Sequence, residues 1–256
     1  MPSEANENIM FAIFKKELRA YFTTPIGYVY VGTFLLAAAL ICSFTTLQQA
    51  SYNTSSYFQY LLFFFIVLIP LLTMRMFAEE RKTRTEQLLL TAPVTITGMV
   101  LGKYFAAFSL FAASILASCI NFLPLVGYAL ADQSSATADT HIGPVGGQVI
   151  GCLIGVILIG AAFIAIGLFI SSLTENQLAA AVISVAALAF TTLVGIVASA
   201  MEASVLRTVL DWISVLNRFD NFALGLFDFS ALLYYTSISG IFIFLTVRVY
   251  EKRRWG

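Results

Sequence analysis

The most regular feature of the chain is the alternation of long apolar runs with short polar segments. Six runs are apolar enough for a helix of about 20 residues to cross a hydrocarbon layer roughly 30 Å thick. They cover residues 26–44, 57–74, 99–125, 149–173, 178–201 and 229–247. The runs are continuous, whereas strands of a membrane β-barrel alternate apolar and polar residues over about ten positions. The pattern therefore predicts six membrane-spanning helices.

The composition agrees with this prediction and excludes a soluble protein. Hydrophobic residues make up 59% of the 256 residues and charged residues only 11%, and the mean hydropathy is +0.89. A soluble domain carries about 25% charged residues, and its surface could not be covered with so few polar groups. We therefore expect an all-α, polytopic membrane protein in which residues 1–256 form a single transmembrane domain.

The sequence offers no set of residues suited to catalysis. The single histidine, His141, lies in a predicted loop, and Cys42, Cys119 and Cys152 are unclustered within apolar runs. The stretch 98–103 has three residues between its glycines, and no Ser or Thr follows its lysine, so it is not a nucleotide-binding P-loop. The central parts of the spans hold no ionisable residue of the kind that ion-coupled carriers use. We expect no enzymatic activity, metal or cofactor in this chain. We also expect the energy for any transport to come from outside the chain.

The positions of the basic residues predict the orientation of the spans. Most of them fall on one side when the N-terminus, segment 75–98, the turn near Glu175 and the C-terminus share that side. These residues are Lys15, Lys16, Arg19, Arg75, Arg81, Lys82, Arg84, Lys103, Arg248, Lys252, Arg253 and Arg254. Only Arg207 and Arg218 lie on the other side. Because short loops rich in Lys and Arg stay in the cytoplasm, we predict that both termini are cytoplasmic.

Residues 1–25 precede the first span and contain an amphipathic stretch, Met10–Phe22. In a helix, Lys15, Lys16 and Arg19 share one face and apolar residues occupy most of the other. Glu17 is the exception, because it falls on the apolar side. Such a helix lies in the membrane surface with its cations toward anionic headgroups. It serves either as a plain anchor or as a mechanical element.

Glycines recur every four residues at the start of the fourth span. They are Gly143, Gly147, Gly151 and Gly155. Small residues at this spacing let helix backbones approach closely in a membrane. The pattern leaves open whether they pack within the chain or at an interface between subunits.

Segment 75–98 is the most highly charged part of the chain, with seven charges among residues 75–86. Opposite charges at a spacing of four residues support a helix. The pairs are Arg75–Glu79, Glu80–Arg84 and Lys82–Glu86. Pro93 marks the expected end, because the residue before a proline avoids helical geometry. The helix is either a solvated connector with self-satisfied charges or a docking element for a cytosolic partner.

The same segment also carries a specific resemblance. From Met74 to Pro93 it reads MRMFAEERKTRTEQLLLTAP, which resembles the signature of ABC-2-type transporter permeases. Within them it is most similar to the gliding-motility-associated permease class. Three further regions agree: Phe14–Leu18 with Thr24–Tyr28, Leu168–Gln177, and the basic C-terminal segment Arg248–Trp255. The resemblance covers essentially the whole chain.

The resemblance implies a fold and a set of contact residues. The fold would be that of an ABC-2 permease of the type V exporter kind, with an N-terminal elbow helix. Glu79–Gln87 would be the main coupling helix and Ser172–Gln177 a second contact, while residues 202–228 would form short re-entrant helices on the outer side. The residues expected at the contact with the ATPase are Glu79, Glu80, Arg81, Thr85, Glu86, Thr174, Glu175 and Asn176.

The resemblance also implies the function. The chain would be the permease subunit of an ATP-binding cassette exporter, in the inner membrane of a bacterium, and a partner ATPase subunit would bind ATP and Mg. Other expected partners are a second permease subunit, identical or related, the lipid bilayer, and an extracytoplasmic auxiliary protein; nucleic acid is not expected. An alternative is a membrane subunit that transmits motion from the ATPase to an extracytoplasmic partner without transporting a substrate.

Overall fold

The computed structural model describes residues 2–48, 52–87, 95–133, 144–202 and 205–255, and these fold predominantly as helices. Six helical stretches are long and apolar enough to cross a membrane. They are Pro25–Leu47, Ser55–Lys82, Ile96–Leu130, Gly146–Leu173, Gln177–Ala200 and Phe229–Trp255. Each overlaps one of the predicted runs, so the prediction of six helices of spanning length is confirmed.

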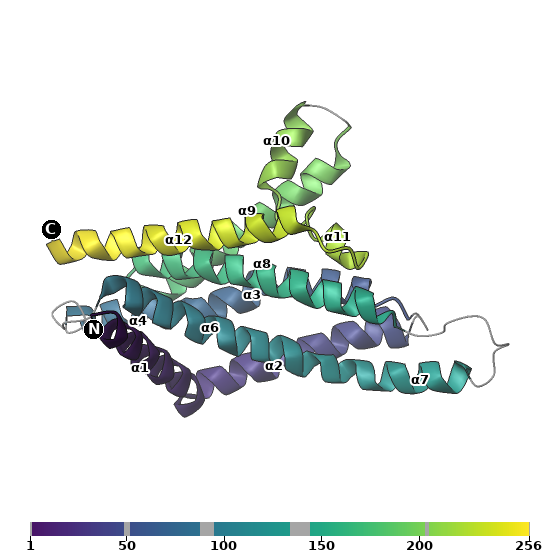
Figure 1. The fold of residues 1–256 in the computed structure, drawn as a ribbon, viewed down its shortest axis with the longest axis horizontal. Helices are drawn as coiled ribbons and strands as arrows, with labels where there is room; N and C mark the ends of the chain where they lie inside the picture. Colours follow the sequence, from purple (N-terminus) through teal and green to yellow (C-terminus); the bar gives the residue numbers. More distant parts are fainter. Residues whose placement is uncertain (1, 49–51, 88–94, 134–143, 203–204, 256) are drawn as a thin grey trace.

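The spanning helices form an elongated bundle (Figure 1). In chain order the main helices are α1 (Pro2–Thr23), α2 (Pro25–Cys42), α3 (Ser55–Thr73), α4 (Arg75–Lys82), α6 (Ile96–Ser118), α7 (Leu123–Gln133), α8 (Gly146–Leu173), α9 (Gln177–Ala200) and α12 (Phe229–Trp255). α1, α4 and the C-terminal end of α12 lie at the same end of the bundle, on the left in Figure 1. This end, called the basic end below, holds the side chains for which we predict a cytoplasmic position.

The third span is longer than the predicted range 99–125. After α6 a 3₁₀ turn at Cys119–Phe122 leads directly into α7, so the helical stretch continues past Pro124. Pro124 is the second residue of α7, in the first turn, where its missing N–H group would have no helical partner in any case. The proline therefore does not end the span.

α8 lies at the centre of the bundle and contacts α3, α6, α9 and α12. Its glycines allow bulky neighbours to approach closely. A Cβ atom at Gly155 would lie 3.0 Å from the ring of Phe219, and one at Gly160 would overlap the ring of Phe111. Within the repeat, Gly151 also packs inside the chain, because its Cβ would lie 2.8 Å from the carbonyl oxygen of Phe222. Gly151 and Gly155 therefore favour the first of the two interpretations of the repeat. Gly143 lies outside the described residues.

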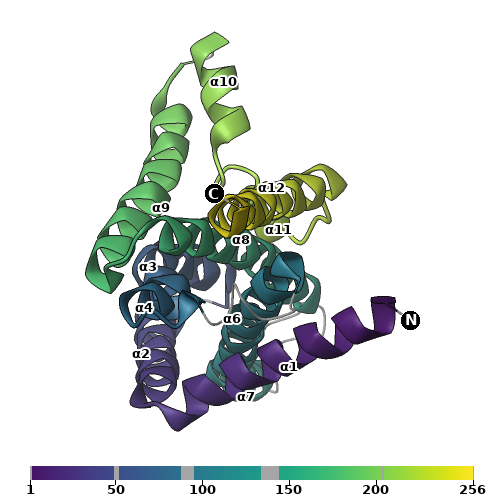
Figure 2. The ribbon, with the colours of Figure 1, turned by 90° about the vertical axis from the view of Figure 1, so that its left-hand side faces the viewer.

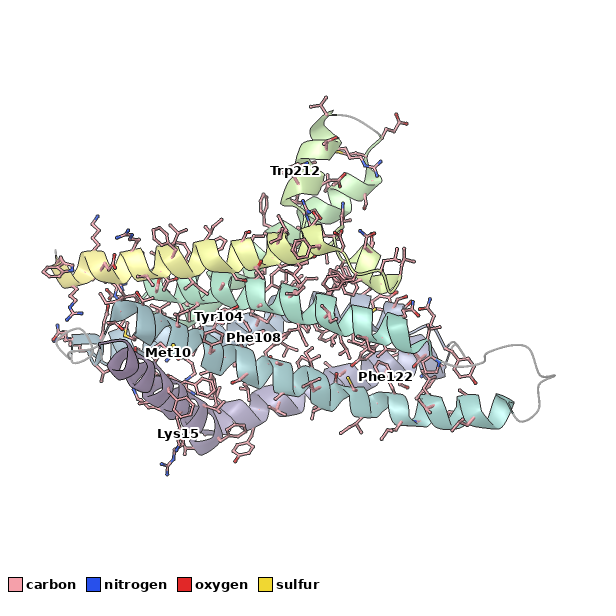
Figure 3. All side chains as sticks on the ribbon, viewed as in Figure 1. Met10, Lys15, Tyr104, Phe108, Phe122 and Trp212 are labelled. Atoms are coloured by element: carbon pink, nitrogen blue, oxygen red, sulfur yellow. The ribbon has the colours of Figure 1, made fainter. Side chains whose placement is uncertain are left out.

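α1 lies across the bundle: Figure 2 shows it from the side, while α12 is seen nearly end-on. Met10 and Ile13 face α6, where both lie within 4 Å of Cβ positions built on glycines of that helix. Lys15 points away from the bundle (Figure 3), and the neighbouring Phe11 is 63% exposed. The exposed cations Lys15, Lys16 and Arg19 and the inward Met10 and Ile13 agree with the predicted amphipathic pattern. Phe11 departs from it because an apolar side chain is exposed, and Glu17 turns toward the bundle. A role of α1 as an elbow helix remains a prediction.

Residues 202–228 contain two short helices, α10 (Val205–Ile213) and α11 (Asp220–Ala223). α11 packs against the first half of α8, where the Gln148 side-chain amide donates to the carbonyl of Ala223 at 2.9 Å. α9 leans away from the bundle with α10 beside it (Figures 1 and 2), and Trp212 of α10 is 70% exposed (Figure 3). Entry of these helices into the membrane remains a prediction.

Candidate functional site

The highly charged segment lies at the basic end, where α4 follows α3 after a break at Met74. The first N–H groups of a helix have no partner within it. In α4, the N–H groups of Phe77 and Ala78 both donate to Ser171 Oγ at 3.2 Å, and this hydroxyl donates to the carbonyl of Met74 at 3.1 Å. One serine near the end of α8 therefore fixes the start of α4.

A buried lysine holds the same helix from the other side. Lys103 of α6 is 1% exposed, and its Nζ lies 2.7 Å from Glu80 Oε1 of α4 and 3.0 Å from Glu17 Oε1 of α1. Its third partner is the carbonyl of Met76 at 2.9 Å, so each of the three ammonium donors has an acceptor. A charge removed from water requires such partners. This Lys103 cluster, formed by Lys103, Glu17 and Glu80, joins three helices.

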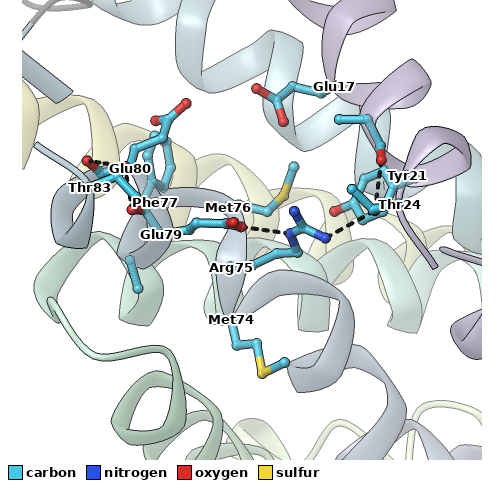
Figure 4. Close-up of polar contacts among 12 residues, drawn as sticks. Glu17, Tyr21, Thr24, Met74, Arg75, Met76, Phe77, Glu79, Glu80 and Thr83 are labelled. Carbon is cyan, nitrogen blue, oxygen red and sulfur yellow. Dashed lines mark hydrogen bonds and ion pairs between the residues drawn. The ribbon is translucent and has the colours of Figure 1, made fainter. Parts of the chain in front are cut away.

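Further polar contacts connect α1 to the start of α4. Figure 4 shows Arg75 between Glu79 and Thr24: its Nε donates to Glu79 Oε2 at 2.8 Å, and its Nη1 donates to Thr24 Oγ1 at 3.2 Å. The hydroxyl of Tyr21 donates to the carbonyl of Leu72 at 3.1 Å. Burial raises the pKa of Tyr21, so this hydroxyl keeps its proton and remains a donor.

A cavity of about 290 Å³ lies between α1 and α4. Its charged lining residues are Lys16, Glu17, Arg75, Glu79, Glu80 and Lys103. The positive and negative side chains are equal in number, so the cavity has no excess charge to select an ion. We interpret it as a gap at the polar interface between α1 and α4.

The turn between α8 and α9 contacts the end of α4 through one arginine. Arg81 Nη2 lies 2.8 Å from Glu175 Oε1, and Arg81 Nη1 donates to the carbonyl of Leu173 at 3.1 Å. Within the turn, Asn176 Oδ1 accepts from the N–H of Leu178 and caps α9, and the hydroxyl of Thr174 donates to a carbonyl of α8. The two segments for which we predicted contact with an ATPase are therefore neighbours.

The predicted contact residues differ in exposure. The side chains of Glu80 and Glu86 are only 16% and 13% exposed and are paired within the chain. Those of Glu79 and Glu175 are 41% and 71% exposed. Arg81 and Thr174 are partly buried, and Thr85 and Asn176 are exposed. Of the predicted contact residues, Glu79, Thr85, Glu175 and Asn176 therefore form most of the accessible surface at the basic end.

Only one of the three predicted i,i+4 pairs forms among the described residues, Arg75–Glu79. α4 ends at Lys82, and Arg84 has a φ of 57°, so the later pairs lose the helical spacing on which they depend. Glu80 turns to the buried ammonium of Lys103, and Glu86 pairs with Arg81 and Arg253. The prediction of one helix that continues to Pro93, and of a coupling helix over Glu79–Gln87, is therefore wrong in its bounds, because a turn at residues 83–85 interrupts it. Pro93 itself lies outside the described residues.

Four residues of this region were missed by the sequence analysis as functional candidates: Glu17, Lys103, Ser171 and Arg253. Two of them carried a signal. Glu17 was the one charge on the apolar face of its helix, and Lys103 was a lone charge near the start of an apolar span. Opposite charges that each look misplaced are candidates for a buried pair. Ser171 and Arg253 carried no comparable signal, because their partners are far away in the sequence.

Comparison with known protein families shows which family this chain belongs to. The family model described as ABC-2 family transporter protein matches residues 6–249. The chain belongs to this family. No curated protein matches the chain. The resemblance to ABC-2 permeases is thereby confirmed at the level of the family, and membership of the gliding-motility-associated class stays a prediction.

Membership of the ABC-2 family defines the general character of the chain. It is a multi-pass membrane protein with a permease domain, and this domain is a membrane subunit and not a nucleotide-binding domain. The family implies partnership with an ABC ATPase subunit.

Proposed function

We propose that this chain is the permease subunit of an ATP-binding cassette exporter and that its ATPase subunit docks on the basic end. The observation that carries the proposal is the pairing of Arg81 with Glu175 at 2.8 Å. It places the end of α4 beside the α8–α9 turn, so two segments separated by about 90 residues present one surface. A single groove on a partner could contact both.

The exposure of the side chains assigns them different roles in this surface. Glu79 and Glu175 pair within the chain but remain exposed, as do Thr85 and Asn176, so a partner can reach them. Glu80 and Glu86 are largely buried in their pairs. We therefore expect the exposed set to contact the ATPase. Glu80 and Glu86 would hold α4 and the following turn in place, so that force applied to the surface reaches the spans.

The remaining assignments follow from the family and from the charge distribution. Two permease subunits would pair with two ATPase subunits, which bind ATP and Mg and move the docking surface when they close. The excess of Lys and Arg at the basic end supports a cytoplasmic position for this surface, and we propose a bacterial inner membrane as its location. The alternative, a subunit that passes motion to an extracytoplasmic partner, uses the same surface but carries no substrate.

The proposal is tested by blocking the surface without disturbing the fold. Thr85→Trp combined with Lys82→Glu adds bulk and reverses charge at two exposed positions at the end of α4, and neither residue belongs to the Arg81–Glu175 pair. The control is Lys15→Trp with Arg19→Glu, at exposed positions of α1 outside the segments that form the proposed surface. We expect the first variant to lose co-purification with the ATPase and stimulation of ATP hydrolysis, with membrane insertion unchanged, and the control to keep both.

Equal behaviour of the two variants would contradict the proposed docking surface. Transport and transmission are separated by a second measurement on the wild-type complex. ATP-dependent movement of a cargo into inside-out vesicles, whose outer face is the cytoplasmic one, supports an exporter. A change in ATPase rate caused by an extracytoplasmic protein, without any cargo, supports the alternative.

A further inference from the structure

The C-terminal end of α8 carries carbonyl groups that no later residue of the helix can satisfy. Two arginines from distant segments take over this task. Arg253 of α12 donates from Nη2 to the carbonyl of Ser172 at 2.7 Å, and Arg81 of α4 donates from Nη1 to the carbonyl of Leu173 at 3.1 Å. Cations at a helix C-terminus also interact favourably with the helix dipole. α8 is therefore capped by side chains of two other helices.

Glu86 lies between the same two arginines. Its Oε1 is 3.1 Å from Arg253 Nη1, and its Oε2 is 3.9 Å from Arg81 Nε. The side chains of Glu86, Arg253 and Arg81 are 13%, 23% and 26% exposed. Together they close a ring from one carbonyl of α8 through Arg253, Glu86 and Arg81 to the next carbonyl. We call these three residues the arginine clasp.

The clasp continues into the interior through aromatic rings. The guanidinium of Arg253 lies over the ring of Tyr250, with 5.2 Å between its Cζ and the ring centroid. The ring of Tyr250 packs against Phe77 of α4 with the centroids 4.7 Å apart. Both rings are nearly fully buried. The last turns of α12 are therefore packed onto α4, and Arg253 stands at the edge of this contact.

We propose that Arg253 is a positioning residue that locks the two segments of the docking surface into one unit and connects this unit to the last span. The inference rests on the proposed function. The family resemblance implied a docking surface made of two segments, the end of α4 and the α8–α9 turn. The inference adds the end of α12 as a third segment that supports them. The planar fork of arginine suits the task, because Nη1 and Nη2 reach different acceptors at fixed spacing. A lysine in this place would reach only one of them.

The test measures the distance between the two segments in the full chain. Spin labels are attached at Lys82→Cys and Leu178→Cys, both exposed, after the three native cysteines are replaced with Ala. We expect a narrow distance distribution in the otherwise unchanged chain and a broad one after Arg253→Ala, with Arg253→Lys only partly restoring it. The control is Arg248→Ala on the same helix, since Arg248 pairs with Glu251 of that helix. It should leave the distribution narrow.

The second readout is association with the ATPase. We expect Arg253→Ala to weaken it at least about tenfold, which corresponds to about 1.4 kcal/mol, and Arg248→Ala to leave it unchanged. A narrow distribution after Arg253→Ala would overturn the inference. A broad distribution with undiminished association would also overturn it, because the clasp would then play no part in docking. Failure of the wild-type chain to bind any ATPase would refute the proposed function instead, and the distance measurement would still decide whether the clasp exists.

Discussion

Replacing Lys103 with Met should destabilise the chain more than replacing its partner Glu80 with Gln. In the Lys103 cluster one buried ammonium faces two carboxylates. Lys103→Met leaves both carboxylates beside each other without a cation. Glu80→Gln leaves one ammonium paired with one carboxylate, and the amide oxygen can still accept a hydrogen bond from Lys103.

The magnitudes follow from the distances. For unit charges 2.7 Å and 3.0 Å apart, the Coulomb attraction is about 6 kcal/mol each at an effective dielectric constant of about 20. Most of this attraction is offset by the desolvation of the ions, so the intact cluster contributes little net free energy. Removal of one member keeps the desolvation of the others, and we expect a loss of about 3–5 kcal/mol for Lys103→Met. For Glu80→Gln we expect about 1–2 kcal/mol, because a charged hydrogen bond becomes a weaker one.

Comparing the double variant with the two single variants provides a sharper test than either single change in the free energy of unfolding. Adding Glu80→Gln to Lys103→Met removes one of the two stranded carboxylates, so the double variant should be more stable than Lys103→Met alone. The measurement is denaturant or thermal unfolding of the purified full chain in detergent, with Arg248→Ala as the control. Arg248 and Glu251 have 64% and 37% exposed side chains, and such a pair is worth about 0–1 kcal/mol. A double variant less stable than Lys103→Met would refute the reasoning.

Two further predictions concern topology and packing. Reporters fused at Thr83 should read cytoplasmic and those at Gln133 extracytoplasmic, because the basic residues gather at the end that holds α4; an extracytoplasmic signal at Thr83 would overturn the orientation. Gly160→Ala should lower the melting temperature of the purified chain, since its Cβ would overlap a buried phenylalanine ring. Gly32→Ala, with no heavy atom within 4 Å of its Cβ, should leave the melting temperature nearly unchanged.

The spans and the first part of the charged helix, up to Lys82, were predictable because each depends on neighbours in the sequence. A run of apolar residues such as 149–173 must be helical in a membrane, since only hydrogen bonds within the segment satisfy its backbone. The faces of α1 followed in the same way from the helical period. The length of the third span was less predictable. Whether Pro124 ends a helix or opens the next turn depends on the local backbone geometry.

The pairing of charges was not predictable from spacing. Glu80 had Arg84 four residues away, and the sequence gives no reason to prefer Lys103, which is 23 residues away. The preference arises from burial, because an ammonium without water gains more from a carboxylate than an exposed guanidinium does. Arg253 is a similar case. In sequence it is one of several basic residues at the C-terminus, and only the packing of α12 on α4 brings it to Glu86.

The positions of the two ionic clusters constrain how α4 can move. The Lys103 cluster ties one side of it to α1 and α6, and the arginine clasp ties its far end to α8 and α12. A shift of α4 alone would strand at least one buried charge, at a cost of about 3–5 kcal/mol. A shift that carries the neighbouring helix ends along keeps every pair. Force from an ATPase should therefore move the neighbouring ends of α1, α6, α8 and α12 together with α4. With α1 in its predicted position in the membrane surface, where Lys15 and Phe11 are exposed, we expect that motion to reach the membrane surface directly.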